Sequence, residues 1–257
     1  MISDHKLLEH DVRKIVRLLA EVSIHVNDQS LAKSTLMKGL CRLIDADSWA
    51  WGLAKDVSPG EPSVHLSLIH GGFTEVTSAM FTRAYQHPDM TDVHTPLVAE
   101  MKRRNCHITR LRQQIDPDGR AFTNGAGPYW EKADIRGVIL SMYPTPGGFI
   151  SIMGIYRRFS ASLFNERENL IAHVALGGFP WLHANNWSAS CKAITGLCTR
   201  KRMITDFLIK GYKRKDIAKH LGISPHTTND YVKSVFEHFQ VHSQAELIGK
   251  FHGGGRL

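Results

Sequence analysis

The chain has few cysteines and lacks a long apolar run. Its 257 residues include four cysteines, at positions 41, 106, 191 and 198, without a CxxC pair or a framework spacing. This usage predicts reduced thiols rather than a disulfide scaffold or a zinc site. No run of 18 or more apolar residues is present, so we expect no transmembrane helix. The first residues lack the apolar block of a signal peptide, and we therefore expect a cytoplasmic protein.

Motifs for catalysis, cofactors and metals are also missing. The sequence contains no Walker loop, no GxGxxG after a predicted strand, and no GxSxG or HExxH. Fifteen histidines are present, but their spacings do not match those of familiar zinc sites. We therefore expect no enzyme activity, no cofactor and no bound metal.

Acidic residues are scarce at one end of the chain. Residues 192–257 contain 12 Lys+Arg and 5 Asp+Glu, a balance of +7. Residues 1–191 contain 20 Lys+Arg and 19 Asp+Glu, a balance of +1. The two segment charges add to the net charge of +8. A localised basic segment is the electrostatic mark of a nucleic-acid binder.

The same segment has the pattern of four short helices. Gly211 and Gly222 each follow an apolar turn and predict helix ends, because glycine readily adopts a left-handed backbone. Ser224-Pro225 predicts a capped helix start. Val232, Val235, Phe236 and Phe239 mark the apolar stripe of that third helix, and Ser243–Glu246 is a capping box for a fourth. The short connection around Gly222 predicts a helix-turn-helix with its recognition helix from Ser224 to Phe239.

The polar side of the third helix and the basic residues beside it are the predicted DNA-binding residues. Asn is suited to adenine and Lys to guanine, and basic side chains contact phosphates. The predicted phosphate contacts are Arg200, Lys213, Arg214 and Lys215, and the predicted groove-facing residues are His226, Thr227, Asn229 and Lys233.

About 55 residues at this end resemble the LuxR/GerE family of bacterial transcription regulators. The resemblance rests on Leu197…Arg200, on Gly211…Lys215-Asp216-Ile217-Ala218…Leu221-Gly222-Ile223-Ser224…Thr227, and on Val235-Phe236…Phe239…Val241…Ser243…Ala245-Glu246-Leu247. It implies an all-α four-helix DNA-binding domain whose third helix enters the major groove and whose fourth often pairs two subunits. The chain departs from the family pattern at Lys201, Met203, Thr228-Asn229, Tyr231 and Gln244.

The remaining residues predict an α+β domain with an antiparallel sheet covered by helices. An amphipathic helix is expected over residues 5–25, with Leu8, Val12, Ile15, Leu19 and Val22 on one face. Further helices are predicted from Ser30 to about Leu43, Thr74 to Gln86, Pro96 to about Arg104, over 128–133, and from Ser162 to about Ala184. Strands are predicted over 48–54, 64–70, 106–109, 137–143 and 149–156, with loop-like composition from 116 to 127. The order of elements is similar to that of GAF- or PAS-like sensor domains, and the passage from Tyr156 to Leu170 resembles the segment that often precedes LuxR-type domains.

Aromatic residues in this domain are candidate ligand contacts. Trp49, Trp51, Tyr85 and Trp130 could wall a pocket for a small-molecule effector, or pack as core. Acyl-homoserine-lactone receptors share the domain order, and they carry a Trp, a Tyr four residues later and an Asp-Pro. This chain has no Tyr at that offset from either Trp, and it carries Pro88-Asp89 in the reverse order.

The sequence therefore predicts a transcription regulator. The expected domains are a sensor or dimerisation domain at 1–184, a linker at 185–196, a LuxR-type helix-turn-helix domain at 197–252 and a tail at 253–257. The expected partners are double-stranded DNA, a second copy of the chain and RNA polymerase, with no membrane. Two alternatives stay open: a quorum-sensing receptor for acyl-homoserine lactones, and a protein-docking adaptor with a degenerate helix-turn-helix.

Overall fold

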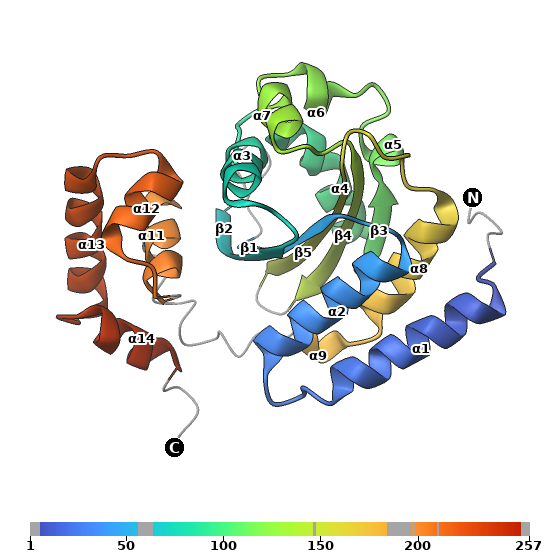
Figure 1. The fold of residues 1–257 in the computed structure, drawn as a ribbon, viewed down its shortest axis with the longest axis horizontal. Coiled ribbons are helices and arrows are strands. Elements are labelled where there is room, and N and C mark those ends of the chain that lie inside the picture. The colour runs from blue at the N-terminus through green and yellow to red at the C-terminus, as the bar shows by residue number, and fades with distance from the viewer. Residues whose placement is uncertain are drawn as a thin grey trace. The chain divides into compact units, whose positions relative to one another are not determined.

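The computed structural model describes residues 6–55, 64–145, 148–183, 197, 199–209 and 211–252. The chain forms two compact units, one from most of residues 1–184 and the other mainly from residues 185–257. Figure 1 labels the helices and strands of both units. The predicted linker at 185–196 and tail at 253–257 lie outside the described residues.

A five-stranded sheet forms the centre of the N-terminal unit. The strands are β1 (Ser48–Lys55), β2 (Val64–Gly71), β3 (Ile108–Leu111), β4 (Gly137–Thr145) and β5 (Phe149–Arg157). Their order is β2-β1-β5-β4-β3, and the β1–β5, β4–β5 and β3–β4 pairs are antiparallel. The register places Ser48 opposite Tyr156 and Gly137 opposite Arg157. The α+β class with an antiparallel sheet is thereby confirmed.

Helices cover both faces of this sheet (Figure 1). They are α1 (Glu9–Ser23), α2 (Gln29–Leu43), α3 (Glu75–Tyr85), α4 (Met90–Arg104), α5 (Arg112–Ile115), α6 (Arg120–Thr123), α7 (Gly127–Lys132), α8 (Glu166–Gly177) and α9 (Pro180–His183). Side chains alternate along a strand, so Trp49 and Trp51 join the core with α1, α2 and α8, whereas Ala50 and Tyr156 join the core with α3 and α7.

Three predicted helix starts were wrong, and one of them is that of α8, which begins at Glu166 with Asn165 as its cap rather than near Ser162. The cap of α2 is Asp28, whose side chain accepts a hydrogen bond from the Leu31 amide, rather than Ser30. Pro96 lies inside α4, which begins six residues earlier at Met90. Although proline removes one helical hydrogen bond, Met90, Leu97 and Met101 are buried against the rest of the unit, and this burial maintains the helix through the proline. The loop-like segment at 116–127 contains the short helix α6.

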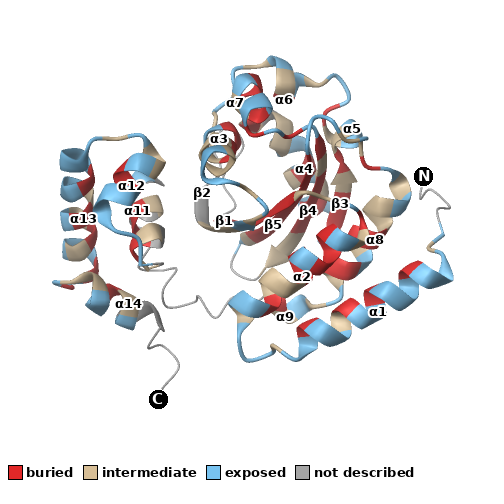
Figure 2. Ribbon diagram, in the orientation of Figure 1, coloured by how far each residue is buried: buried red, intermediate tan, exposed pale blue. Residues whose placement is uncertain are grey.

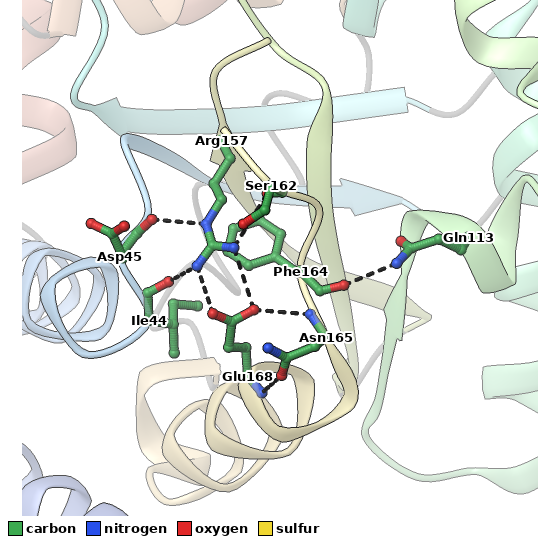
Figure 3. Close-up of polar contacts among 8 residues, drawn as sticks. All are labelled: Ile44, Asp45, Gln113, Arg157, Ser162, Phe164, Asn165 and Glu168. Carbon is green, nitrogen blue, oxygen red and sulfur yellow. Dashed lines mark hydrogen bonds and ion pairs between the residues drawn. The ribbon is translucent and has the colours of Figure 1, made fainter. Parts of the chain in front are cut away.

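A buried arginine joins three parts of this unit (Figure 3). Arg157, at the end of β5, donates to the backbone oxygens of Ile44 and Asp45, beyond the end of α2, and to that of Ser162. Its guanidinium also pairs with Glu168 in the first turn of α8 at 2.6 Å. Because one planar group meets all of these acceptors, Arg157 fixes where α8 begins relative to the sheet.

The C-terminal unit consists of α11 (Thr199–Ile209), α12 (Arg214–Leu221), α13 (Pro225–Phe239) and α14 (Gln244–His252). Helix α13 packs on α11 and α12, and α14 packs on α11. Ile204, Leu208, Val232, Val235 and Leu247 are fully enclosed between these helices. The predicted all-α arrangement of four helices is confirmed in this unit.

Candidate functional site

The joint between α12 and α13 has the geometry that its residues predict. Gly222 adopts a left-handed backbone (φ 61°, ψ 36°), and its amide donates to the carbonyls of Ala218 and Lys219. Two residues later the Ser224 side chain accepts from the Thr227 amide, with Pro225 at the first position of α13. The chain therefore leaves one helix and enters the next within three residues, as a helix-turn-helix requires.

Helix α13 has one buried and one exposed side (Figure 2). Thr228, Val232, Val235 and Phe239 are buried. The predicted groove-facing residues, His226, Thr227, Asn229 and Lys233, are all exposed. The predicted phosphate contacts Arg200, Lys213, Arg214 and Lys215 are exposed as well.

The structure brings some of these side chains together. Arg214, in the first turn of α12, donates from Nη1 to the Asn229 amide oxygen at 3.3 Å. Its guanidinium carbon also lies 5.9 Å from the Phe236 ring centroid. The Arg214 side chain therefore reaches from α12 to α13 and orients the Asn229 amide. His226 faces Asp230 at 3.1 Å, one helical turn along the same side. Arg200 comes from a different helix, α11.

Two residues that hold this geometry were not predicted as site residues. The Thr228 hydroxyl donates to the Ser224 carbonyl at 3.0 Å, so a polar side chain occupies a core position without an unpaired group. The Gln244 side chain donates to the backbone oxygens of Leu208 and Tyr212 at 2.8 and 3.1 Å, which ties α14 to the end of α11. Both positions depart from the family pattern, and this departure was the only sequence signal for them.

The four aromatic candidates in the N-terminal unit do not lie together. Tyr85 and Trp130 line a cavity of about 50 Å³ between the sheet and its covering helices. Trp49 and Trp51 pack on the opposite face of the sheet. Trp51 donates from Nε1 to the Ser151 hydroxyl at 2.8 Å, so its polar edge is satisfied inside that core.

The cavity is apolar and contains titratable groups. Tyr156 and His94 also line it. Burial raises the pKa of Tyr85 and of Tyr156, and burial lowers the pKa of His94 to about 4. Both phenols and the imidazole are therefore neutral near pH 7. This arrangement can hold a small ligand by apolar contact.

Metal-ligand clusters and membrane-spanning helices are both absent from the part of the chain that the structure describes. No group of three or more His, Cys, Asp or Glu is placed to hold a metal ion there. None of its helices is long and apolar enough to cross a bilayer.

Comparisons with known proteins assign the C-terminal unit. Residues 195–251 match the family described as "Bacterial regulatory proteins, luxR family". No curated protein matches the chain.

Two solved structures are similar over most of their length. One is SdiA in complex with octanoyl-rac-glycerol, with 11% identity, a TM-score of 0.44 and coverage of 98% of each chain. The other is Escherichia coli SdiA, with 13% identity, a TM-score of 0.43 and coverage of 94% of this chain and 96% of that chain. At this level of similarity neither structure bears on ligand or partner. The family match and the turn geometry agree, and the C-terminal unit is a helix-turn-helix domain of the LuxR family.

Proposed function

We propose that this protein is a bacterial transcription regulator that acts in the cytoplasm. Two copies bind duplex DNA through α13, and the N-terminal unit responds to a small-molecule signal. The observation that carries the proposal is the exposed polar side of α13, which follows a three-residue turn within a LuxR-family domain.

The position of the basic residues supports contact with phosphates. Lys213, Arg214 and Lys215 lie at the N-terminus of α12, where the helix dipole disfavours positive charge. Arg214 contacts Asn229 and Phe236 within the unit. Because Lys213 and Lys215 do not stabilise their own helix, an external anion is a better explanation for these two. The amides of Asp216 and Ile217 already donate to the Lys213 carbonyl, so the amides of Arg214 and Lys215 are the ones that can serve a phosphate.

A second copy is the proposed protein partner. Helix-turn-helix proteins commonly read two half-sites one turn of DNA apart, a spacing of about 34 Å. Recognition by one short helix buries little surface, so a pair of recognition helices gives the affinity that a specific site needs. RNA polymerase is the further partner through which such a regulator would act on transcription.

The N-terminal unit is the proposed sensor, and its cavity is the proposed ligand site. The site is lined by Tyr85 and Trp130 among the aromatic candidates. A ligand that binds two arrangements of the protein with different affinities shifts the population toward one of them. Such a shift could change how well two copies engage DNA.

The test is selection of duplexes from a random pool by the full-length protein, followed by fluorescence anisotropy on the selected site. We expect Lys233→Ala, at a groove-facing residue suited to guanine, to weaken binding by about 1–3 kcal/mol and to relax the preference at one guanine position. Asn229→Ala should cost about 1–3 kcal/mol and relax the preference at one base position. Lys14→Ala, on the exposed side of α1, makes the same change of net charge outside the domain and should leave binding unchanged.

Enrichment of no sequence over random duplex would contradict the proposal. An adaptor that binds protein would give that result, together with weak binding to any polyanion. Unchanged DNA binding by both Lys233→Ala and Asn229→Ala would show that the exposed side of α13 does not contact DNA.

A further inference from the structure

The cavity between the sheet and helices α4 to α7 adjoins a second hollow. This larger hollow of about 400 Å³ shares three lining residues with it, Val93, Ile115 and Asp116. The inner space of about 50 Å³ has room for three or four water-sized groups. A ligand could therefore place a short apolar tail inside and a polar group toward the second hollow.

The cavity wall contains a cation whose hydrogen bonding is incomplete. Arg112, the first residue of α5, lines the inner space. Its Nε is buried and has no hydrogen-bond partner among the described residues. Its guanidinium carbon lies 4.8 Å from the Phe122 ring centroid. A buried donor left without an acceptor costs about 1–3 kcal/mol, so the site favours a ligand that supplies one.

The acidic residues that line the second hollow are already engaged. Asp116 accepts from the amides of Arg120 and Ala121 at 2.8 and 2.9 Å. Asp118 pairs with the Arg120 side chain at 3.1 Å, and Asp89 accepts from the Gly125 amide at 2.9 Å. These carboxylates stabilise the loops around the second hollow, and no described carboxylate pairs with Arg112.

We infer that this cavity binds an amphiphilic carboxylate, whose apolar tail lies against Trp130, Leu140 and Tyr156 and whose carboxylate accepts from Arg112. This inference rests on the proposed sensor role of the N-terminal unit and specifies its ligand class. Hydrogen bonds between a guanidinium and a carboxylate are about twice as strong as neutral ones. The apolar tail supplies the remainder of the affinity through burial.

The experiment is thermal unfolding of the full-length protein with hexanoate, hexanamide or sodium chloride at equal concentration. Hexanamide keeps the tail and the carbonyl oxygen but carries no charge. We expect hexanoate to raise Tm, and hexanamide to give less than half of that shift. Equal shifts with the two compounds, or no shift with hexanoate, would overturn the inference.

Two variants locate the effect. Arg112→Gln should abolish the difference between hexanoate and hexanamide. Arg120→Gln, at a more exposed arginine of the outer hollow, should preserve it. Ala121→Leu fills the cavity and should abolish both shifts while Arg112 is retained. A full hexanoate shift in folded Arg112→Gln would contradict the assignment.

These measurements contain no DNA, and the DNA measurements contain no carboxylate. A hexanoate response without DNA preference would refute the proposed regulator but support the ligand class. DNA preference without a hexanoate response would support the proposed regulator but refute the ligand class.

Discussion

Arg157 is the last residue of β5 and Arg158 follows it, but the two have different environments. Arg157 is 4% exposed, and its partners are backbone carbonyls and Glu168 (Figure 3). Its guanidinium carbon lies 4.1 Å from the Phe164 ring centroid. Arg158 is exposed and pairs with Asp47. The two arginines therefore give a matched comparison of a buried and an exposed ion pair.

We predict that Arg157→Met lowers the free energy of unfolding of the N-terminal unit by about 3–5 kcal/mol. The substitution removes the charged partner of the largely buried Glu168 carboxylate, which keeps only the Asn165 amide as a donor among the described residues, and it also removes the donor to the Ile44 and Asp45 carbonyls. Arg157→Lys should recover only part of the loss, because an ammonium cannot reproduce the planar arrangement of donors. Urea unfolding followed by tryptophan fluorescence measures both.

Arg158→Met is the control, and it should have a much smaller effect because its ion pair is solvated. Similar losses for the two methionine variants would show that the Arg157 contacts are not what stabilises the start of α8.

Single residues explain why part of the site was not predictable. The sequence places two arginines after a strand, and only the packing of α2 and α8 decides which one is enclosed. The lack of a hydrogen-bond partner at Arg112 Nε is likewise not predictable from the sequence. It depends on the fold, in which the nearby Asp116 carboxylate accepts from the backbone amides of Arg120 and Ala121.

At the scale of elements, the connection between α12 and α13 depends on one backbone conformation. Gly222 has a left-handed backbone, in which a side chain is strained. Gly249 lies within α14, and a methyl group added there would meet nothing within 4 Å. The same substitution should therefore have opposite effects at the two glycines.

We predict that Gly222→Ala destabilises the helix-turn-helix by about 1 kcal/mol, whereas Gly249→Ala stabilises α14 by up to about 1 kcal/mol. Hydrogen exchange is the measurement, because it resolves the two segments. Amides of α12 and α13 should exchange about fivefold faster in Gly222→Ala, and those of α14 should exchange more slowly in Gly249→Ala. Equal rates for Gly222→Ala and the parent would mean that the turn tolerates a side chain.

Elements with both a periodic pattern and a cap were predictable from sequence. Helix α13 starts after Ser224, and strands β1 and β5 lie where alternating apolar residues predict them. Helix α1 shows the limit of that reasoning. Leu8 and Val12, which were predicted to share its apolar face with Ile15 and Val22, are 54% and 45% exposed. The apolar face of α1 is wider than the surface that α2 and α8 cover. Periodicity in the sequence does not show how much of such a face the neighbouring helices will bury.

At the scale of the whole molecule, we expect a cluster of three histidines, in addition to His94, to make the N-terminal unit sensitive to acid. The rings of His107 and His173 stack at 4.5 Å, and His183 stacks on Tyr143 at 4.1 Å. His107 and His173 share hydrogen bonds with Thr109, and His183 lies between the Ser151 hydroxyl and the Leu176 carbonyl. Arg110 and Lys33 are the nearby cations, and no described carboxylate forms an ion pair with these imidazoles.

Burial and neighbouring positive charge disfavour protonation of this cluster. Burial, together with the adjacent histidines, lowers the pKa of His107 to about 3. Burial lowers the pKa of His183 to about 4, and burial and Arg110 lower the pKa of His173. In the unfolded chain these groups titrate near 6.5, so below that pH the unfolded state binds more protons than the folded state.

Stability should therefore be complete above about pH 6.5 and decline as the pH falls toward 4. His107 and His183 should each contribute roughly 1 kcal/mol per pH unit to this decline. Burial raises the pKa of the Asp47 carboxyl, but hydrogen bonds from Arg158 outweigh burial and lower it, and a hydrogen bond from Arg167 lowers the pKa of Asp11. These carboxyls lose their contribution only as the pH falls below about 5. Urea unfolding between pH 7.5 and 5, followed by tryptophan fluorescence, isolates the histidine range.

The variant His107→Gln should reduce the slope of unfolding free energy against pH by the contribution of one histidine. The glutamine amide can hydrogen-bond to Ser141 but does not titrate. The control His242→Gln, in the other unit, should leave this slope unchanged. A parent protein equally stable at pH 7.5 and pH 5 would show that these imidazoles are not protonated on unfolding, and hence that they are not enclosed as the stacked rings indicate.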